Sequence, residues 1–513
     1  MSLGVVHGLR LVRVLWSLSR HGALFPLQAF EAPGWLVFGF KFLERKKGAE
    51  RPGSRLASAL QVLGPTFVKL GQSLAVRGDL IGDDVADDLS ALHDDLPPFS
   101  SLEAIATIER ELNCDLEQLF SHFDEVPTAA ASIAQVHFAE RHDGVEVAVK
   151  VLRPGIEDDF ARDIDFFRWI ANLVEKFFPA ARRLKPRDVV RSFEETVRLE
   201  MDLRLEAAAA GELAENFSED AEFRVPLVDW ERTSRRVLTL ERVDGIPIDE
   251  IAKLEAAGIV PCDLLARSAR IFFNQVFRDG FFHADMHPGN MFVAADGVLS
   301  PVDFGIMGRL DRKTRYFLAD MLIAFLERDY MKVAEVHFTA GYVPSNKSLG
   351  AFAQACRAIA EPILGKSQNE ISIARLLGQL FHVTHAFEME TQPQLLLLQK
   401  TMLVAEGVGR KLDSESNMWV LAEPLIVEWM HENRGPEARL RDLATEVARG
   451  VERLPHGVLK LAALSEMVTA GGLKLHPHTV EALNGASRNG FWGWLGWVAL
   501  GILVGLLIGA NIF

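Results

Sequence analysis

Lysine, aspartate and asparagine residues occur in this chain at spacings that suit phosphoryl transfer. Val147-Ala148-Val149-Lys150 places a lysine at the end of an apolar strand, from which its ammonium group can reach the α- and β-phosphates of a nucleotide. Asp285 is followed five positions later by Asn290, the spacing of a catalytic loop whose Asp acts on the nucleophile and whose Asn holds Mg²⁺. Asp303, in Asp303-Phe304-Gly305, comes 13 residues after Asn290 and adds a second oxygen ligand for Mg²⁺. This order predicts a site for Mg²⁺ and a nucleotide.

The same loop allows a second interpretation, a metal site of HxDxH type formed by His283, Asp285 and His287. Such a site would normally draw further His or Glu ligands from other regions, and it leaves Asn290 and Asp303 without a role. We therefore keep the metal site as the alternative to the nucleotide site.

A few elements are expected to position these residues. A hairpin is predicted from Thr128 to Val151, because a turn at Asp143-Gly144 precedes alternating valines. A second strand pair should flank Asp296-Gly297. The stretch from Val189 to Phe217 is rich in Glu, Leu, Arg and Ala and predicts one long helix. After about Asp311 the pattern is helical as far as about Leu475.

The composition is that of a large, folded, acidic protein. The chain has 513 residues, enough for about three domains, and 49% of them are hydrophobic. Its 55 Lys and Arg and 70 Asp and Glu give a formal charge of −15, which opposes a nucleic-acid partner that needs a basic surface. Three scattered cysteines, Cys114, Cys262 and Cys356, suit a reducing compartment, so we expect the catalytic part in the cytosol.

The two ends of the chain indicate a membrane. Phe491 to Phe513 contain no Asp, Glu, Lys or Arg and begin with a cluster of tryptophans, which predicts a transmembrane helix; a buried core helix is the alternative. Gly501, Gly505 and Gly509 lie on one face of this segment and predict a homodimer. The first 47 residues hold seven basic and two acidic residues, a net charge of +5, and predict either an amphipathic segment on an anionic leaflet or a helix packed on the domain.

Further motifs strengthen the prediction of a nucleotide site. They are Lys69-Leu70-Gly71-Gln72 (KxGQ), the Ala-rich run from Ala129 to His137, Glu200-Met201-Asp202 (ExD), and Glu206 followed by four alanines. With these motifs the chain resembles the UbiB family of atypical kinases, also called the ADCK family, which supports ubiquinone biosynthesis. The resemblance is dense over roughly residues 60 to 345 and looser beyond them.

The resemblance implies a role for each of these residues. Lys150 and Asp285 would be catalytic, and Glu206 would orient Lys150. Asn290 and Asp303 would bind the metal. The KxGQ segment would cover the place where a protein substrate docks and contact the ExD pair, so Lys69 would act as a gate. The cofactor-binding residues would be Ala129, Ala130, Ala131, Ser132, Ile133, Ala134, Gln135, Val136, Lys150 and Glu206, and the regulatory residues would be Lys69, Gly71, Gln72, Glu200 and Asp202.

Departures from ordinary protein kinases favour ATP hydrolysis over protein phosphorylation. Ala129 to Ala131 replace a Gly-rich loop and restrict positive φ, which should alter nucleotide preference. Ala284 stands where protein kinases carry Arg, and no Ala-Pro-Glu follows Asp303 before the helical region. The expected activity is therefore that of an atypical kinase or ATPase using ATP and Mg²⁺, with water as a candidate phosphoryl acceptor. The alternative is a nucleotide-binding pseudokinase scaffold that presents lipid intermediates to partner enzymes.

The expected fold is α+β, an atypical protein-kinase-like bilobal fold. Its predicted parts are a basic membrane-facing segment (1–47), a helical KxGQ extension (48–120), the nucleotide-binding core (121–345), a helical C-terminal region (346–489) and a transmembrane helix (490–513). The resemblance implies a bacterial inner-membrane protein, single-pass at its C-terminus, with a cytoplasmic catalytic domain. Its implied partners are membrane lipids, polyprenyl quinone precursors and other ubiquinone biosynthesis enzymes.

Overall fold

A computed structural model of the chain describes most of its first 434 residues. The described residues are 3–25, 51–75, 81–90, 92, 97–177, 185–362, 383–384, 386–389, 392–413 and 418–434. The chain divides into two compact units, Met1–Met430 and His431–Phe513, and the description below concerns the first.

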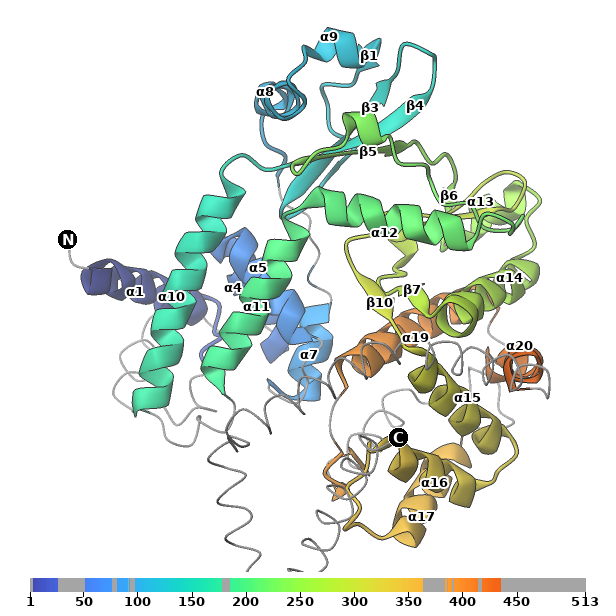
Figure 1. Cartoon of the computed structure of the whole chain (residues 1–513). Coiled ribbons are helices and arrows are strands. Elements are labelled where there is room, and N and C mark those ends of the chain that lie inside the picture. Colours follow the sequence, from blue (N-terminus) through green and yellow to red (C-terminus); the bar gives the residue numbers. More distant parts are fainter. Residues whose placement is uncertain are drawn as a thin grey trace, which may run out of the picture. The chain divides into compact units, whose positions relative to one another are not determined.

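An antiparallel sheet carries the predicted strand lysine (Figure 1). Its strands are β1 (His122–Phe123), β2 (Ala129–Ala130), β3 (Ala134–Glu140), β4 (Glu146–Leu152) and β5 (Val237–Glu241). The predicted hairpin is confirmed as β3 and β4, which pair from Ala134↔Leu152 to Glu140↔Glu146. Val147, Val149 and Val151 are buried against α8 (Ser101–Leu112), beyond which lies the short α9 (Leu116–Leu119). The alternate residues of β4, Lys150 among them, therefore point to the opposite face of the sheet.

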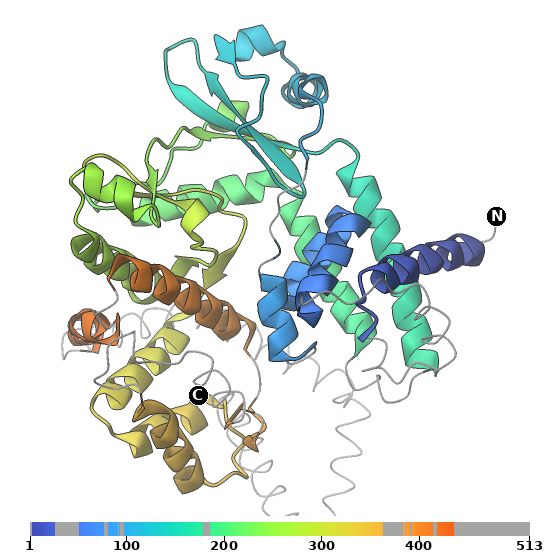
Figure 2. The same cartoon turned by 180° about the vertical axis from the view of Figure 1, so that it is seen from behind.

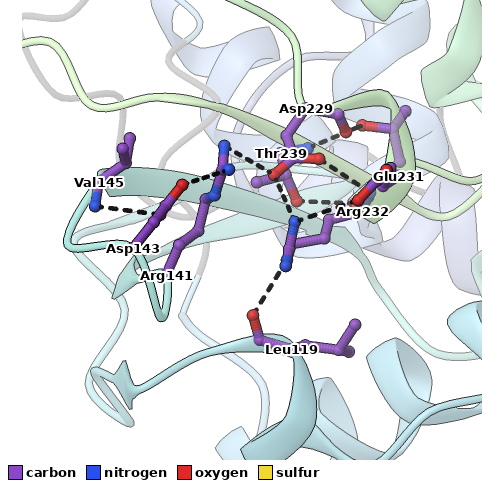
Figure 3. Close-up of polar contacts among 9 residues, drawn as sticks. Leu119, Arg141, Asp143, Val145, Asp229, Glu231, Arg232 and Thr239 are labelled. Atoms are coloured by element: carbon purple, nitrogen blue, oxygen red, sulfur yellow. Dashed lines mark hydrogen bonds and ion pairs between the residues drawn. The ribbon is translucent and has the colours of Figure 1, made fainter.

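A polar network fixes the end of the β3–β4 hairpin (Figure 3). Arg141, after β3, donates to Asp143 in the turn over 2.6 Å and lies 3.4 Å from Asp229. Arg232, in the 3₁₀ turn η2 (Trp230–Arg232), pairs with the same Asp229 at 2.9 Å and donates to the Leu119 carbonyl over 3.0 Å. Asp229 thus ties the hairpin to the segment before β5, which limits movement of the strand that bears Lys150.

Helices that precede this sheet in sequence pack beside it with two helices that lie between β4 and β5 (Figures 1 and 2). The buried interface between these helices includes Leu56, Leu60, Phe67 and Val68. These helices are α1 (Leu3–Arg20), α4 (Pro52–Leu63), α5 (Pro65–Ala75), α7 (Asp83–Ser90), α10 (Ile156–Phe177) and α11 (Pro186–Glu200).

Helix α1 packs on the domain, which is one of the two alternatives for the basic N-terminus. One face packs on α4 and α10, where Leu15 is buried and Arg10 forms an ion pair with Asp163. The other face is exposed and apolar, formed by Val5, Val6, Leu9, Val12 and Trp16. The helix therefore docks on the domain and still presents an apolar stripe to its surroundings.

The predicted long helix from Val189 to Phe217 is wrong, because the chain breaks at the ExD motif. Helix α11 ends at Glu200, and α12 spans Leu203–Asn216. Asp202 is extended (φ −117°, ψ 91°), and its carboxylate caps α12 by accepting a hydrogen bond from the Arg204 amide. Leu203 donates its amide to the carbonyl of Arg235 beside β5 instead of to the preceding turn. An Asp side chain that competes for backbone amides favours an N-cap over a helix interior, and this break puts Glu200 and Glu206 on different helices.

Short strands and helices follow β5 and form the second lobe. The strand pair predicted around Asp296-Gly297 is confirmed as β8 and β9. A strand pair that the sequence did not predict, β7 with β10, lies beside the catalytic loop, with Met307 paired to His283. The elements are β6 (Ile246–Pro247), α13 (Ile251–Ala256), α14 (Pro261–Phe273), the π-helical turn η3 (Asn274–Asp279), β7 (Phe281–His283), η4 (Pro288–Asn290), β8 (Met291–Val293), β9 (Leu299–Pro301), β10 (Met307–Arg309), α15 (Arg312–Leu326), α16 (Tyr330–Ala340), α17 (Leu349–Ala360), α19 (Pro393–Leu412) and α20 (Met418–Arg434).

Within the described residues, no helix is both long enough and apolar enough to cross a membrane. The segment 490–513, predicted to be transmembrane, lies outside the described residues together with Gly501, Gly505 and Gly509. Residues 26–47 of the basic N-terminal segment lie outside them as well.

Candidate active site

The ammonium group of Lys150 joins the two lobes. On the sheet side, its Nζ donates to both carboxylate oxygens of Glu206 in α12, at 2.7 and 2.9 Å. From the other lobe, Asp303 accepts from the same Nζ at 3.1 Å. The side chain of Lys150 is 17% exposed and that of Glu206 8%, so this pair is sheltered from water. Two carboxylates thus hold the lysine in one rotamer.

Burial and charge set the protonation of this trio. Burial alone lowers the pKa of Lys150, but the charges of Asp303 and Glu206 outweigh it and raise that pKa. Lys150 in turn lowers the pKa of Asp303, with a smaller contribution from Lys69. Burial raises the pKa of Glu206 to about 7, because the attraction of Lys150 does not fully compensate it and Asp303 repels the charge. Lys150 therefore stays cationic and Asp303 anionic near neutral pH.

Asp303 has a left-handed backbone, with φ 62°. Its carboxylate accepts a hydrogen bond from the Gly305 amide at 3.3 Å, and its side chain is 51% exposed. The next residue, Phe304, is buried and packs edge-to-face on the His283 ring. A left-handed backbone is unfavourable for a non-glycine residue and persists only where the surrounding structure stabilises it. Such residues concentrate at functional sites. The buried Phe304 fixes the conformation that turns the Asp303 carboxylate towards Lys150.

The catalytic loop follows β7 and is internally hydrogen-bonded. The Asn290 side-chain amide donates to the Asp285 carbonyl at 3.0 Å and to its carboxylate at 3.4 Å. The Val302 amide donates to the Asn290 carbonyl, which places the residue before Asp303 beside the loop. Because the Asn290 nitrogen is used within the loop, its amide oxygen remains as a possible metal ligand. The structure thus brings Asp285 and Asn290 into contact and positions Asp303 next to them in the fold.

The two histidines of the loop are used for its backbone geometry. His283 is buried, accepts from the Asp285 amide at 3.2 Å through Nδ1, and places Nε2 3.3 Å from the Val302 carbonyl. Burial lowers the pKa of His283, so the ring is neutral. His287 Nδ1 accepts from the Gly289 amide. Among the described residues no group of three His, Cys, Asp or Glu side chains could hold a metal ion, so the HxDxH alternative gains no support.

The Ala-rich run forms the β2–β3 turn and the start of β3. The Ala131 amide donates to the Ala134 carbonyl at 2.7 Å, which closes the turn around buried Ser132. Val136 is paired directly with Lys150, so the two side chains share the face of the sheet that carries the site. Gln135 points the other way, where its side chain contacts His137 and the Phe99 amide. The side chain of Gln135 is thus not brought to the site, although its backbone belongs to the loop.

Arg153 anchors this turn, although no local sequence pattern marks it as part of the site. Its guanidinium donates twice to the Ala131 carbonyl, at 2.9 and 3.1 Å, and once to the Pro97 carbonyl at 2.9 Å. It also lies over the Phe99 ring, 5.5 Å from the ring centroid. The turn that would approach a nucleotide is therefore clamped from outside.

The KxGQ helix reaches the ExD motif through one residue of each. Lys69 Nζ lies 3.1 Å from Glu200, and these side chains are 12% and 17% exposed. Asp202 instead pairs with Arg204, at 2.6 Å.

Gly71 packs so closely that an added Cβ would lie 2.6 Å from Leu92 and 2.7 Å from Leu60. Gln72 donates to the Leu92 carbonyl at 3.3 Å. Lys69 and Glu200 thus connect α5 to α11, while Gly71 and Gln72 hold α5 against its neighbours.

Two family models match consecutive parts of the chain. Residues 91–337 match the ABC1 atypical kinase-like domain, and residues 356–417 match the UbiB helical domain. A solved structure titled as the complex of Rv3197 with erythromycin, from Mycobacterium tuberculosis, is 25% identical with a TM-score of 0.51, covering 72% of this chain and 95% of that one. The chain has the bilobal fold of an atypical kinase, with mostly helical content.

Two curated relatives extend the match over most of the chain. A protein named probable protein kinase UbiB from Marinobacter nauticus is 40% identical over 460 residues, covering 87% of this chain and 83% of the relative. A protein of the same name from Pseudomonas paraeruginosa is 41% identical over 488 residues, covering 93% and 89%. With both domain models matched in order and relatives aligned over more than four fifths of their length, this chain belongs to the UbiB family of atypical kinases.

Proposed function

We propose that this protein is a membrane-anchored, kinase-like ATPase that supports ubiquinone biosynthesis. The observation that carries the proposal is the contact of Lys150 with Glu206 at 2.7 Å and with Asp303 at 3.1 Å, across two lobes. This is the arrangement in which a lysine is poised for nucleotide phosphates while a carboxylate is held for Mg²⁺. Family membership and the names of the relatives support the link to ubiquinone.

The residues of the site fit ATP and Mg²⁺. Lys150 would contact the nucleotide phosphates, and the oxygens of Asn290 and Asp303 would hold the metal, which prefers hard oxygen ligands. Bound Mg²⁺ would neutralise charge on the phosphates as they react. Asp285, fixed by Asn290 at 3.0 Å, would accept the proton of the attacking group.

Water is the proposed phosphoryl acceptor. Lys69 on α5 pairs with Glu200 at 3.1 Å and is close enough to the site to lower the pKa of Asp303. A helix held there by a sheltered ion pair would obstruct a protein substrate, whereas water needs no docking surface. Hydrolysis would then drive the handling of lipid intermediates or the organisation of biosynthetic enzymes.

The membrane part of the proposal rests on the ends of the chain. The uncharged segment 491–513 would anchor the protein in the bacterial inner membrane, with the catalytic domain in the cytoplasm and a homodimer through Gly501, Gly505 and Gly509. The exposed apolar stripe of α1 supports contact with membrane lipids. Polyprenyl quinone precursors and other ubiquinone biosynthesis enzymes are the proposed partners.

The proposal is tested by the ubiquinone content of a bacterial strain whose own UbiB-family gene has been deleted. We expect the full chain to restore ubiquinone and Asp303→Asn to fail, because the metal ligand is weakened. Asp249→Asn is the matched control, since Asp249 pairs only at the surface with Lys411, at 3.0 Å. Restoration by Asp303→Asn to the level of the control would contradict a Mg²⁺-dependent role and favour the scaffold alternative.

A further inference from the structure

A lysine from outside the kinase-like domain lies beside the catalytic aspartate. Lys400 Nζ is 3.9 Å from Asp285 Oδ1, and each side chain is 34% exposed. Lys400 is on α19 (Pro393–Leu412), within the residues that match the UbiB helical domain, 356–417. Asp285 belongs to the kinase-like domain, 91–337. The helical domain thus reaches the centre of the candidate active site.

The neighbouring residue fixes α19 against the catalytic loop. Thr401 is fully buried, and its hydroxyl lies 3.2 Å from the Ala284 carbonyl and 2.9 Å from the Leu397 carbonyl of its own helix. Leu398 and Val408 on the same helix are buried in the main hydrophobic core. The contact with Ala284, one residue before Asp285, holds the helix in the register that puts Lys400 next to Asp285.

The charges around Asp285 make this lysine significant. Residues 284–290 contain no Lys or Arg. Lys150 is held by Glu206 and Asp303. Within the described residues, Lys400 is the cation that forms an ion pair with Asp285. At 3.9 Å with partial exposure, this attraction is that of two charges through a partly aqueous medium, not that of a short hydrogen bond.

We propose that Lys400 is a positioning residue of the active site. It balances the charge of Asp285, so that a nucleoside triphosphate can approach this carboxylate. The pair Lys400–Asp285 has no net charge. Without Lys400, an uncompensated carboxylate would face the terminal phosphate, and without both charges the site would again be neutral. The inference rests on the proposed function, because it requires Mg²⁺–nucleotide binding near Asp285.

The test is the affinity of the full chain for two magnesium complexes, MgADP and Mg–AMP-PNP, at low ionic strength. We expect Lys400→Met to weaken Mg–AMP-PNP binding about fivefold, since a partly exposed ion pair of this kind is worth up to about 1 kcal/mol. MgADP lacks the terminal phosphate and should be affected less than about twofold, because the Coulomb interaction with Asp285 weakens with distance. Lys400→Arg should retain the affinity of the wild type, because the charge is kept.

The decisive variant is Lys400→Met with Asp285→Asn, which restores neutrality. We expect it to recover Mg–AMP-PNP affinity to within about twofold of the wild type, an effect that a purely structural lysine would not produce. Lys411→Met on the same helix is the matched control and should bind as the wild type does, because its partner Asp249 is at the surface. Unchanged affinity in Lys400→Met, or no recovery in the double variant, would overturn the inference. Absence of binding by the wild type would instead overturn the proposed function.

Discussion

Lys150 and Glu206 form a sheltered ion pair. Burial and a second carboxylate both disfavour the charged form of Glu206. Glu206 is 8% exposed, and its pKa is raised to about 7. Lys150 also contacts a second carboxylate, that of Asp303, and lowers its pKa. The orientation of Lys150 through Glu206 is therefore sensitive to pH near neutrality, whereas its contact with Asp303 is not.

The first prediction concerns the pH dependence of stability. The pKa of Glu206 is 4.5 in a solvated chain and about 7 in the fold. Between these values the folded state holds a proton that the unfolded state has lost, so the contribution of Glu206 to the free energy of unfolding falls as pH rises through this window. We expect the Tm of the wild type, minus that of Glu206→Gln, to fall from pH 4.5 to 7 and then level off.

The control for this measurement is Glu212→Gln, on the same helix but 39% exposed in its pair with Arg309. Its difference from the wild type should change little over the same pH range. A difference for Glu206→Gln that is constant, or that rises with pH, would contradict the protonation assigned to Glu206.

The second prediction concerns Arg153, which clamps the Ala-rich turn. Arg153→Met removes two hydrogen bonds to the Ala131 carbonyl and one to that of Pro97. We expect MgADP affinity to fall about tenfold, because a bond from a charged donor contributes about 1.5–3 kcal/mol and the loosened turn must be reordered on binding. Arg162→Met, which removes an exposed pair with Asp159, should bind as the wild type does. Equal affinities of the two variants would show that the clamp does not position the turn.

At the level of elements, the strand pair β7–β10 supports the catalytic loop from behind. Gly308 in β10 is buried opposite Phe282 of β7. A Cβ at Gly308 would lie 2.1 to 2.6 Å from three carbons of the Phe282 ring, and Phe282 is fully buried. The rigid ring has no room to move, so this glycine is required by the close approach of the two strands.

The third prediction is that Gly308→Ala lowers the free energy of unfolding by about 1–3 kcal/mol, the usual cost of overpacking a core. Chemical denaturation measures it. Phe282→Leu in the same chain should recover part of the loss, since it removes the ring that the new methyl group meets. Gly350→Ala in α17, with no atom within 4 Å of the added Cβ, is the control and should be neutral or slightly stabilising. A loss in the control as large as that in Gly308→Ala would refute the packing argument.

The sequence predicts the elements whose patterns are local and misses those that depend on distant partners. The β3–β4 hairpin follows from its valines and its Asp143-Gly144 turn, and Asp285, Asn290 and Asp303 follow from spacing. The break at Asp202 depends on the carbonyl of Arg235, which is distant in sequence and becomes a partner only in the folded chain. Lys400 lies 115 positions beyond Asp285, and nothing in the local pattern of a helical lysine marks it as part of the site.

Across the first compact unit, α1 connects its exposed apolar stripe to the KxGQ helix through packed helices. It packs on α4 and α10, and α5, which carries Lys69, packs on both of these. Its exposed stripe includes Leu9, Val12 and Trp16, and Arg13 and Arg20 are exposed beside it. We therefore expect a displacement of α1 at an anionic surface to displace α5 through the packed helices, without any change in the nucleotide site itself.

The fourth prediction is that ATP hydrolysis is faster in anionic than in neutral liposomes, by a factor of about three or more, and that salt reduces this difference. Arg13→Ser with Arg20→Ser should remove most of the acceleration and leave the rate in neutral liposomes unchanged. Arg328→Ser, which removes an exposed arginine from the other lobe, is the control. Equal rates in anionic and neutral liposomes would sink the idea that lipid charge acts through α1.

Mg²⁺-dependent phosphate release from ATP by the full chain in liposomes decides whether the site hydrolyses ATP. The measurement compares the wild type with Asp303→Asn, and with Asp249→Asn as a surface control. We expect release by the wild type and the control, and a loss of about 100-fold or more in Asp303→Asn, because a metal ligand and partner of Lys150 is neutralised. Nucleotide binding without release, or equal release by the wild type and Asp303→Asn, would contradict this expectation.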